Sequence, residues 1–405
     1  MTASMTGQPW LGAEATRAVM TALEAAGGVG CARFVGGCVR NSLLGQPVDD
    51  IDIATRLKPE ETIAALKSAG LKAVPTGVEH GTVTGVSGGR PYEITTLRRD
   101  VETDGRRAVV AFTQDWVEDA ARRDFRINAL YADAVGTVFD PTGGGLDDAM
   151  AGRIVFVGEP EQRIREDYLR ILRFFRFHAW YGRGGLDAAG LAACAALKDG
   201  MARLSAERVS KELLKLLAAP DPTPTMRAMA QAGVLAQVLP ELSDLDLFEA
   251  AAERSSDAVM RLSALLPPDG DRVDAAARRL RLSNADRARL VTAVDDGAVD
   301  VGMAARGARA ALYRLGRRTF EDRLLRAEAA TGTARDDLHA LAETWASPKV
   351  PVGGKDVARL GLAAGPATGA VLKAFEDQWV ADDFPEVGHQ ERLAALVAGL
   401  NRPRG

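Results

Sequence analysis

Two aspartates, Asp50 and Asp52, lie in a stretch that is typical of a β-strand following a turn at residues 45–47. Side chains alternate between the two faces of a strand. We therefore expect both acids on one face, with Ile51 and Ile53 pointing into the core on the other. Neighbouring carboxylates repel one another and lose hydration, and binding a divalent cation is the usual reason to keep them together. The pair predicts a Mg²⁺ site.

Two glycines, Gly36 and Gly37, precede these acids where a predicted strand gives way to a short helix. Glycine lets backbone amides approach a phosphate closely at a helix start, and Arg40 adds a cation one turn later. Each feature alone is more often a simple turn or a surface acid pair. Together, a phosphate cradle beside a magnesium-type acid pair indicates phosphoryl or nucleotidyl transfer.

The whole string from Gly36 to Asp52 resembles the head signature of the class II tRNA nucleotidyltransferase and bacterial poly(A) polymerase superfamily. The resemblance implies that Gly36, Gly37 and Arg40 hold a nucleoside triphosphate. Asn41 stands where the family usually carries Asp, which affects a local contact and not the metal pair.

A third acid, Glu93, lies in a strand predicted for residues 92–97. It reaches the metal site as a third carboxylate if that strand lies beside Asp50 and Asp52. The alternative is an ordinary acid on the surface of a strand.

Residues 122–130, Arg-Arg-Asp-Phe-Arg-Ile-Asn-Ala-Leu, resemble the second motif of the same family, with Arg126 in place of the usual Thr. By resemblance, Arg123 and Asp124 bind the nucleotide, the guanidinium through phosphate or ribose oxygens and the carboxylate through a ribose hydroxyl. The alternative is a mutual surface ion pair, which contributes little.

Residues 80–82, His-Gly-Thr, resemble the tRNA-repairing branch of the family. Residues 98–111, rich in Arg, Asp, Glu and Gly, are expected to form a mobile loop. The poly(A) branch typically looks Arg-rich where this chain has His-Gly-Thr, and we take residues 80–82 together with the loop to favour the tRNA-repairing branch.

Residues 166–177 predict one helix, with Tyr168, Ile171, Leu172 and Phe175 on its apolar side. Four residues spaced three apart lie across the opposite side of this helix: Asp167, Arg170, Arg173 and Arg176. Aligned arginines repel one another unless something anionic lies along them. An ordinary amphipathic helix with an ion pair explains the apolar side equally well, but not three arginines in register with one acid.

Asp167 and Arg170 have the hydrogen-bonding capacity to select a base. A carboxylate accepts from an exocyclic amine and a guanidinium donates to a ring nitrogen or carbonyl, so cytosine and adenine fit the pair while guanine and uracil do not. The segment resembles the family's Glu-Asp-x-x-Arg motif, which is credited with that role. Arg173 and Arg176 would then face the triphosphate or the primer end.

A further helix is predicted over residues 205–217, capped by Ser205. It resembles the fifth motif of the family. We expect Glu207, Arg208 and Glu212 to brace the helix at 166–177.

The composition suits a globular protein with no membrane segment, since none of the apolar runs in the 405 residues is long enough to span one. Its three cysteines lack the spacing of a zinc site or disulfide framework, and the expected location is the cytoplasm. The net charge is −4, yet residues 272–326 hold 13 Arg against 7 acids. Such a stripe can bind RNA, or Arg can simply be the cation of helix surfaces.

The predicted fold class is α+β, with a small mixed β-sheet head followed by an all-helical neck, body and tail. The expected domains are a nucleotidyltransferase head (1–145), a nucleotide-selecting neck (146–220) and a tRNA-binding body and tail (221–405). The resemblance implies addition of CCA to tRNA from CTP and ATP, with Mg²⁺ held by Asp50 and Asp52. The alternatives are a poly(A) polymerase or A-adding enzyme, a protein-modifying nucleotidyltransferase, and a non-catalytic RNA-binding module.

Overall fold

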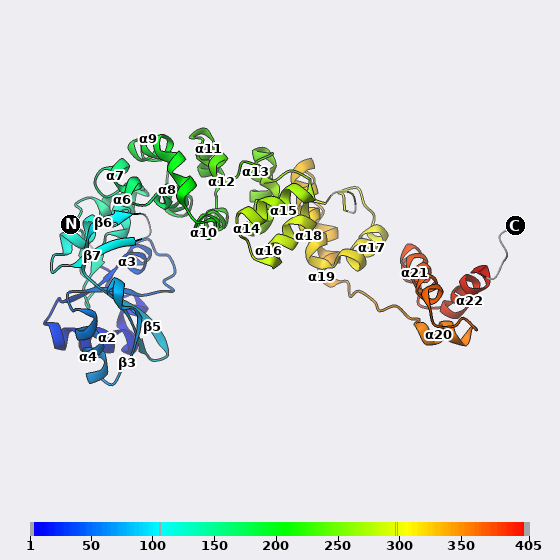
Figure 1. Cartoon of the computed structure of the whole chain (residues 1–405), viewed down its shortest axis with the longest axis horizontal. Helices are drawn as coiled ribbons and strands as arrows, with labels where there is room; N and C mark the ends of the chain where they lie inside the picture. Colours follow the sequence, from blue (N-terminus) through cyan, green and yellow to red (C-terminus); the bar gives the residue numbers. More distant parts are fainter. Residues whose placement is uncertain (1–3, 105–106, 296, 298, 401–405) are drawn as a thin grey trace. The chain divides into compact units, whose positions relative to one another are not determined.

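The computed structural model describes residues 4–104, 107–295, 297 and 299–400, and it divides into two compact units, Met1–Pro240 and Glu241–Gly405. The first unit carries a sheet followed by helices, and the described part of the second unit is helical (Figure 1). The predicted α+β fold class is confirmed. The predicted division into three domains stays a prediction. Among the described residues, no helix is both long and apolar enough to cross a membrane.

The main sheet has seven strands in the order β3-β4-β5-β2-β1-β8-β9. Only β2 and β5 run parallel, and the other neighbouring pairs in this sheet are antiparallel. The strands are β1 (Ala32–Val35), β2 (Asp52–Thr55), β3 (Lys72–Gly77), β4 (Thr82–Ser87), β5 (Arg90–Thr96), β8 (Tyr131–Ala132) and β9 (Val138–Phe139).

Six α-helices accompany the sheet among the described residues. They are α1 (Pro9–Gly12), α2 (Glu14–Gly27), α3 (Gly37–Leu43), α4 (Pro59–Ser68), α5 (Trp116–Ala121) and α6 (Gly145–Ala151), with 3₁₀ turns η1 (Val78–His80) and η2 (Arg126–Asn128). The α4 helix follows its sequence signals closely: Pro59 opens it, and the Glu61 carboxylate accepts from the Lys58 amide at 2.8 Å.

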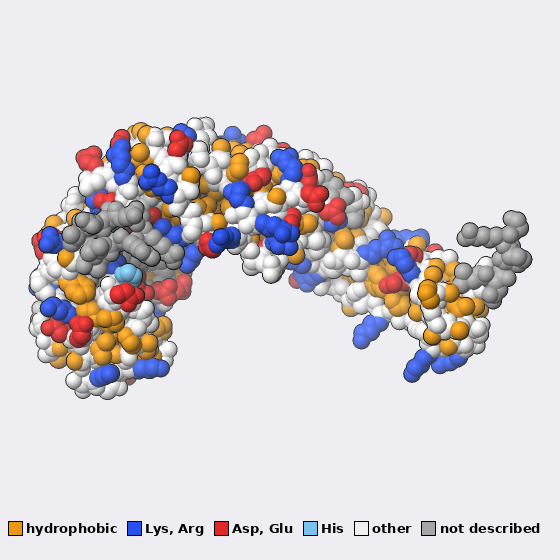
Figure 2. All heavy atoms as spheres, in the orientation of Figure 1, with side chains coloured by type: hydrophobic (Ala, Val, Ile, Leu, Met, Phe, Trp, Pro, Cys, Tyr) orange, Lys and Arg blue, Asp and Glu red, His pale blue; other side chains and the backbone are white. Residues whose placement is uncertain are grey.

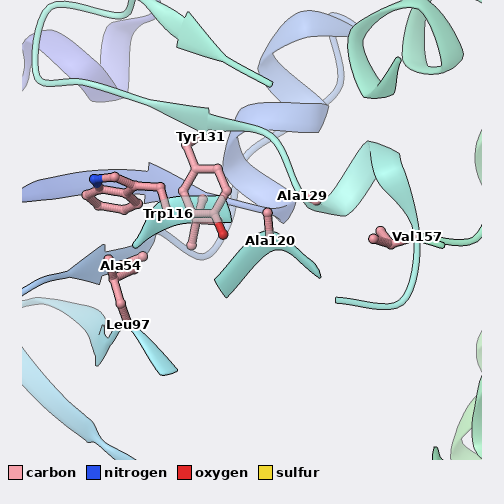
Figure 3. Close-up of a cluster of buried hydrophobic side chains, with 8 residues drawn as sticks. Ala54, Leu97, Trp116, Ala120, Ala129, Tyr131 and Val157 are labelled. Carbon is pink, nitrogen blue, oxygen red and sulfur yellow. The ribbon is translucent and has the colours of Figure 1, made fainter. Parts of the chain in front are cut away.

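A buried apolar cluster lies where α5 covers one face of the sheet (Figure 3). Trp116 and Tyr131 meet edge to face with ring centroids 5.4 Å apart, a favoured arrangement of aromatic rings. Val35, Ala54 and Leu97 complete the contact from the sheet side. This cluster fixes α5, and with it the residues that follow α5, against the strands that carry the acids.

The expected strand around Asp50 and Asp52 is shorter than predicted, because β2 begins only at Asp52. Asp50 lies in the preceding connection, so strand alternation does not place it. Ile51 and Ile53 are both 1% exposed, which confirms that they point into the core.

The loop predicted over residues 98–111 is wrong for the residues that the structure describes, 98–104 and 107–111, and residues 105 and 106 lie outside the described part. Strands β6 (Arg98–Asp104) and β7 (Arg107–Phe112) form a separate two-stranded antiparallel sheet. The charged residues suggested a loop, but residues 108–112, Ala-Val-Val-Ala-Phe, have strong strand propensity, and pairing between the strands satisfies the backbone.

The remaining helices of the first unit are α7 (Pro160–Glu166), α8 (Leu169–Tyr181), α9 (Ala188–Leu197), η3 (Lys198–Arg203), α10 (Ala206–Leu217), α11 (Thr223–Gln231) and α12 (Val234–Val238). The single helix predicted over residues 166–177 is wrong at its start. Asp167 is extended (φ −155°, ψ 105°), so α7 ends at Glu166 and a new helix begins at Leu169. The Asp167 carboxylate accepts from the Leu169 amide at 3.1 Å, which supplies the break with a hydrogen-bond partner.

The second unit consists of α13 (Leu245–Arg254), α14 (Ala258–Leu265), α15 (Gly270–Arg279), α16 (Asn284–Val294), α17 (Ala305–Leu315), α18 (Arg317–Thr331), α19 (Asp336–Thr344), α20 (Gly354–Arg359), α21 (Pro366–Ala381) and α22 (His389–Leu400). Side chains of α20–α22 share an apolar cluster that Tyr313 of α17 joins. The rings of Tyr313 and Trp379 pack edge to face with their centroids 6.0 Å apart, which is a contact between α17 and α21.

Replacing Gly145 with Ala is expected to lower the free energy of unfolding of the first unit by about 2–4 kcal/mol. The added Cβ would lie 2.5 Å from the Arg126 carbonyl oxygen and 3.0 Å from its carbon, so backbone must shift. Denaturant unfolding measures the change. Gly369→Ala, inside α21 with nothing within 4 Å, is the control and should be neutral or stabilising by up to about 1 kcal/mol. Equal effects of the two changes would contradict the packing argument.

Candidate active site

The parallel pairing of β2 with β5 places Asp52 directly opposite Glu93. The strand that carries Glu93 therefore lies beside Asp52, which is the condition for Glu93 to act as a third carboxylate. Burial, Glu93 and Asp50 together raise the pKa of Asp52 from 3.8 to about 6, and Arg123 lowers it. The three acids are thus within electrostatic reach of one another, although only Asp52 and Glu93 are aligned by strand pairing.

Burial and nearby acids disfavour the charged form of the Asp52 carboxylate, and a bound cation would favour it. Oxygen-only donors suit a hard divalent ion such as Mg²⁺. In the part of the chain that the structure describes, no three Asp, Glu, His or Cys side chains form a ready-made metal cluster. The assignment of Asp50 and Asp52 as metal ligands accordingly remains a proposal, and it is the chemistry of the donors that supports it.

Arg123 is held beside these acids by partners that the sequence analysis missed. Its Nε donates to the Tyr131 hydroxyl at 3.1 Å and its Nη2 to Asp119 at 3.1 Å, while Tyr131 donates to Asp119 at 2.7 Å. The paired arginines hold the pKa of Asp119 down at about 2, against the effect of burial. The spacing of Asp119 four residues before Arg123 was the available signal.

The other terminal nitrogen of Arg123 points to the glycine turn. A Cβ at Gly36 would lie 3.7 Å from Arg123 Nη1. Gly36 itself has φ +71°, a conformation that favours glycine, and it precedes the α3 helix that begins at Gly37. Gly36, Arg123 and Asp52 therefore lie together, as a phosphate-handling site requires.

Arg40 is only 6% exposed and points into the protein. It donates to Asn41 at 2.8 Å, to the Tyr181 hydroxyl at 2.9 Å and to the Asn128 side chain. The Asn41 amide also donates to the Pro47 carbonyl at 2.8 Å. Asn41, which stands where the family usually has Asp, therefore still accepts from Arg40 and orients it. The role of Arg40 in binding the nucleotide stays a prediction.

Asp124 pairs with a residue of the helical region and not with its neighbour Arg123. Its carboxylate accepts two hydrogen bonds from Arg173 at 2.7 and 2.5 Å, and another from Asn128 at 3.0 Å. Arg173 keeps the pKa of Asp124 at about 2 although Asp124 is buried. The mutual surface ion pair of Arg123 and Asp124 is therefore excluded.

The α10 helix braces α8 as predicted. Arg208 donates to Asp167 at 2.6 Å, and Glu212 accepts from Arg176 at 2.5 Å and lies 3.8 Å from Arg173. Glu207 is exposed. Ser205 is the N-cap of α10, but its side chain makes no capping hydrogen bond. The row of arginines on α8 thus has protein anions, Asp124 and Glu212, as partners.

The proposed base-selecting pair, Asp167 and Arg170, flanks the break between α7 and α8. Arg170 donates to Glu166 at 2.7 Å and to the Arg122 carbonyl at 3.1 Å. Asp167 and Arg170 are joined through the backbone, since the Arg170 amide donates to the Asp167 carbonyl at 2.9 Å. Their selection of cytosine and adenine remains a proposal.

Arginines of residues 272–326 are largely paired with acids of their own unit. Arg289 bonds to Asp257 and Asp322 at 2.8 and 2.7 Å, and Arg323 to Asp295 at 3.0 Å. Figure 2 shows Lys and Arg interspersed with Asp and Glu over the helical part of the face drawn. This pairing favours the interpretation of Arg as a structural cation, and RNA binding by this segment stays a prediction.

The mixed-sheet head and its acid pair define a nucleotidyltransferase of the poly(A) polymerase type. Residues 32–155 match the family described as "Poly A polymerase head domain", and residues 186–245 match "Probable RNA and SrmB- binding site of polymerase A". The chain is similar to the CCA tRNA nucleotidyltransferase 1, mitochondrial, of Mus musculus, at 34% identity over 86% of this chain and 82% of that protein. It is also 39% identical to the CCA-adding enzyme of Geobacillus thermodenitrificans over about half of each chain (53% and 52%).

The solved structures agree with the sequence matches. The Bacillus stearothermophilus CCA-adding enzyme in complex with CTP superposes with a TM-score of 0.76 at 28% identity, covering 97% of this chain and 98% of that one. A Thermotoga maritima CCA-adding enzyme, at 20% identity and a TM-score of 0.65, shares the fold. The chain belongs to the class II CCA tRNA nucleotidyltransferase and poly(A) polymerase family. Members of this family generally use a divalent metal.

In the absence of metal, Asp52→Asn is expected to stabilise the protein at pH 7.5 by on the order of 1 kcal/mol. The amide removes a carboxylate that Glu93 and Asp50 repel. The pKa of Asp52 is raised to about 6 in the folded state, so between about pH 4 and 6 the folded protein binds a proton that the unfolded chain does not. The contribution of Asp52 to the free energy of unfolding of the wild type therefore falls as pH rises through this range. Urea unfolding in EDTA tests this. A gain that persists at pH 3.5 would contradict it.

Arg173→Met is expected to cost about 3–5 kcal/mol, because it leaves the Asp124 carboxylate buried without its cation. The control is Arg165→Met, which removes an exposed ion pair with Glu161 and should cost less than about 0.5 kcal/mol. Adding Asp124→Asn to Arg173→Met should recover part of the loss. Thermal and urea unfolding give the values, and equal losses for the two single variants would rule out a special role for the buried pair.

Proposed function

We propose that this chain adds cytidine, cytidine and adenosine to tRNA 3′ ends, using CTP and ATP and releasing pyrophosphate. The observation that carries the proposal is the alignment of Asp52 with Glu93 beside Gly36 and Arg123, in a chain that spans 82% of a curated CCA tRNA nucleotidyltransferase. No template strand is required, since the base would be selected by protein side chains.

The proposed reaction is in-line attack of the RNA 3′ hydroxyl on the α-phosphate. Asp50 and Asp52 would hold Mg²⁺, with Glu93 as a third carboxylate. Bound there, the ion would supply stabilisation of the charge that develops on the phosphate oxygens. Arg123, fixed by Asp119 and Tyr131, would orient the triphosphate at Gly36 and Gly37.

Selection of the base would fall to Asp167 and Arg170. In this proposal Arg208 and Glu166 hold the two side chains in place between additions, and a base with an exocyclic amine would compete for the Asp167 carboxylate. Arg173 and Arg176, tied to Asp124 and Glu212, would present their charge toward the triphosphate or the primer end. Arg40, held by Tyr181 and Asn128, would bind the triphosphate together with the backbone at Gly37.

The cytoplasmic location expected from sequence stays a proposal, because the mouse and human relatives are named as mitochondrial. The alternative activity is that of a poly(A) polymerase or of a tRNA nucleotidyltransferase that adds A only, since the matched family is described as "Poly A polymerase head domain". A protein-modifying nucleotidyltransferase and a non-catalytic RNA-binding module are further alternatives that one assay separates.

Purified protein with Mg²⁺ and tRNA ending at its discriminator base is expected to add three nucleotides only when CTP and ATP are both present. Gel electrophoresis resolves the products. GTP and UTP should give none, and Asp52→Asn should lower the rate by at least about 100-fold. Addition from ATP alone onto tRNA ending in CC would indicate an A-adding enzyme, and long ladders on any RNA a poly(A) polymerase. No extension under any condition would overturn the proposed function.

A further inference from the structure

One tryptophan of the helical region is exposed and has no part in the site described above. Trp180, near the end of α8, is 41% exposed, whereas Trp10, Trp116 and Trp379 are at most 8% exposed. A large aromatic surface left in solvent loses the favourable free energy of burial, so its position and surroundings are informative.

Trp180 continues the row of side chains that connects α8 to the acids. At 100° per residue, Arg173, Arg176 and Trp180 lie within one 60° sector of the helix, with Phe177 and Tyr181 beside them. Arg173 bonds to Asp124, while the Arg40 guanidinium lies 4.1 Å from the ring centre of Tyr181. Trp180 therefore lies on the side of α8 that carries Arg173 and packs against α10, about 10 Å along the axis from the arginine that bonds to Asp124.

The indole ring is held in place by one polar contact. Its Nε1 donates to the Lys215 carbonyl of α10 at 2.7 Å. The contact fixes one edge of the ring on the turn that ends α10 and leaves part of the ring in solvent. An aromatic ring fixed before binding loses little conformational freedom when a flat ligand stacks on it.

The two helices that meet at this contact both carry basic residues, among them Arg176 on α8, and Lys211 and Lys215 on α10. Burial and the positive charge of Arg176 lower the pKa of Lys215, and Lys211 and Arg173 act in the same direction. Glu212 is the acid that opposes them. An anion bound here would relieve this repulsion.

We propose that Trp180 is a stacking platform for an unpaired base of the RNA 3′ end, with Arg176 and Lys215 contacting the adjoining phosphates. A ring flanked by cations is the arrangement that binds single-stranded nucleic acid. The inference rests on the proposed function and adds a positioning residue to it. Trp180 holds the RNA strand, and the incoming nucleotide is bound by other residues.

Three variants separate stacking from packing. Trp180→Ala removes the ring, Trp180→Leu keeps apolar volume without an aromatic face, and Trp180→Phe keeps the face without the N–H. The KM for tRNA lacking CCA is expected to rise about 5- to 100-fold for Ala and Leu, and to return within about threefold of wild type for Phe. The KM for CTP should not change. Val29→Ala, at a 96% exposed site between α2 and β1, is the matched control and should resemble wild type.

Two kinetic outcomes would overturn the proposal. Unchanged KM for tRNA in Ala and Leu would show that the ring does not contact RNA. Equal defects in Ala, Leu and Phe would assign Trp180 a structural role through its N–H. Circular dichroism and thermal unfolding establish that each variant is folded, and the Leu variant keeps the comparison valid if Ala unfolds.

A binding measurement without turnover tests the platform independently of the reaction. In EDTA, a single-stranded RNA ending in CC is expected to quench tryptophan fluorescence of the wild type, and Trp180→Phe should lose most of that quenching. Blunt double-stranded RNA should quench less. Equal quenching by polyglutamate would indicate an acidic protein partner and overturn the RNA assignment. If the wild type extends no RNA, the proposed function is wrong. In that case, quenching by single-stranded RNA that is lost in Trp180→Phe would still support RNA binding at Trp180, and no quenching would contradict it.

Discussion

The buried ion pair of Asp124 and Arg173 is the interaction on which the candidate site depends. Asp124 follows Arg123, which reaches the glycine turn, and Arg173 lies on α8 with Arg170 and Arg176. Two hydrogen bonds of 2.7 and 2.5 Å join them. A carboxylate buried this deeply is costly without its cation, so the pair fixes where α8 lies relative to the residues that follow α5.

The pair is one link in a longer polar chain. Asn128 donates to Asp124 and accepts from Arg40, Arg40 also donates to Tyr181 of α8, and Glu212 of α10 holds Arg176. Buried polar groups that are all satisfied favour one arrangement of the elements that carry them. The chain explains why arginines that looked like nucleotide ligands in the sequence also act as structural cations: the same side chains position α3, α8 and α10 and supply positive charge near the acids.

The acids of the candidate site, unlike Asp124, lie beside other acids. Asp52 and Glu93 lie opposite one another on parallel strands, and burial together with the charges of Glu93 and Asp50 raises the pKa of Asp52 to about 6. Such an arrangement lowers the stability of the fold, and it is retained where function needs it. A bound phosphate group would lie between these acids and the guanidinium of Arg123, which Asp119 and Tyr131 hold in place.

The sequence by itself determined the α+β class, three strands of the sheet (β1, β2 and β5), the glycine turn and the acids, because these follow from local periodicity and residue type. The structure was needed to show the start of β2 after Asp50, the pairing of β6 with β7, and the break at Asp167, where the carboxylate accepts from both Leu169 and Arg208. It also decided the partners of Asp124, Arg40 and Trp180. Those partners lie 49, 88 and 35 positions away, at Arg173, Asn128 and Lys215, and no local spacing encodes such contacts.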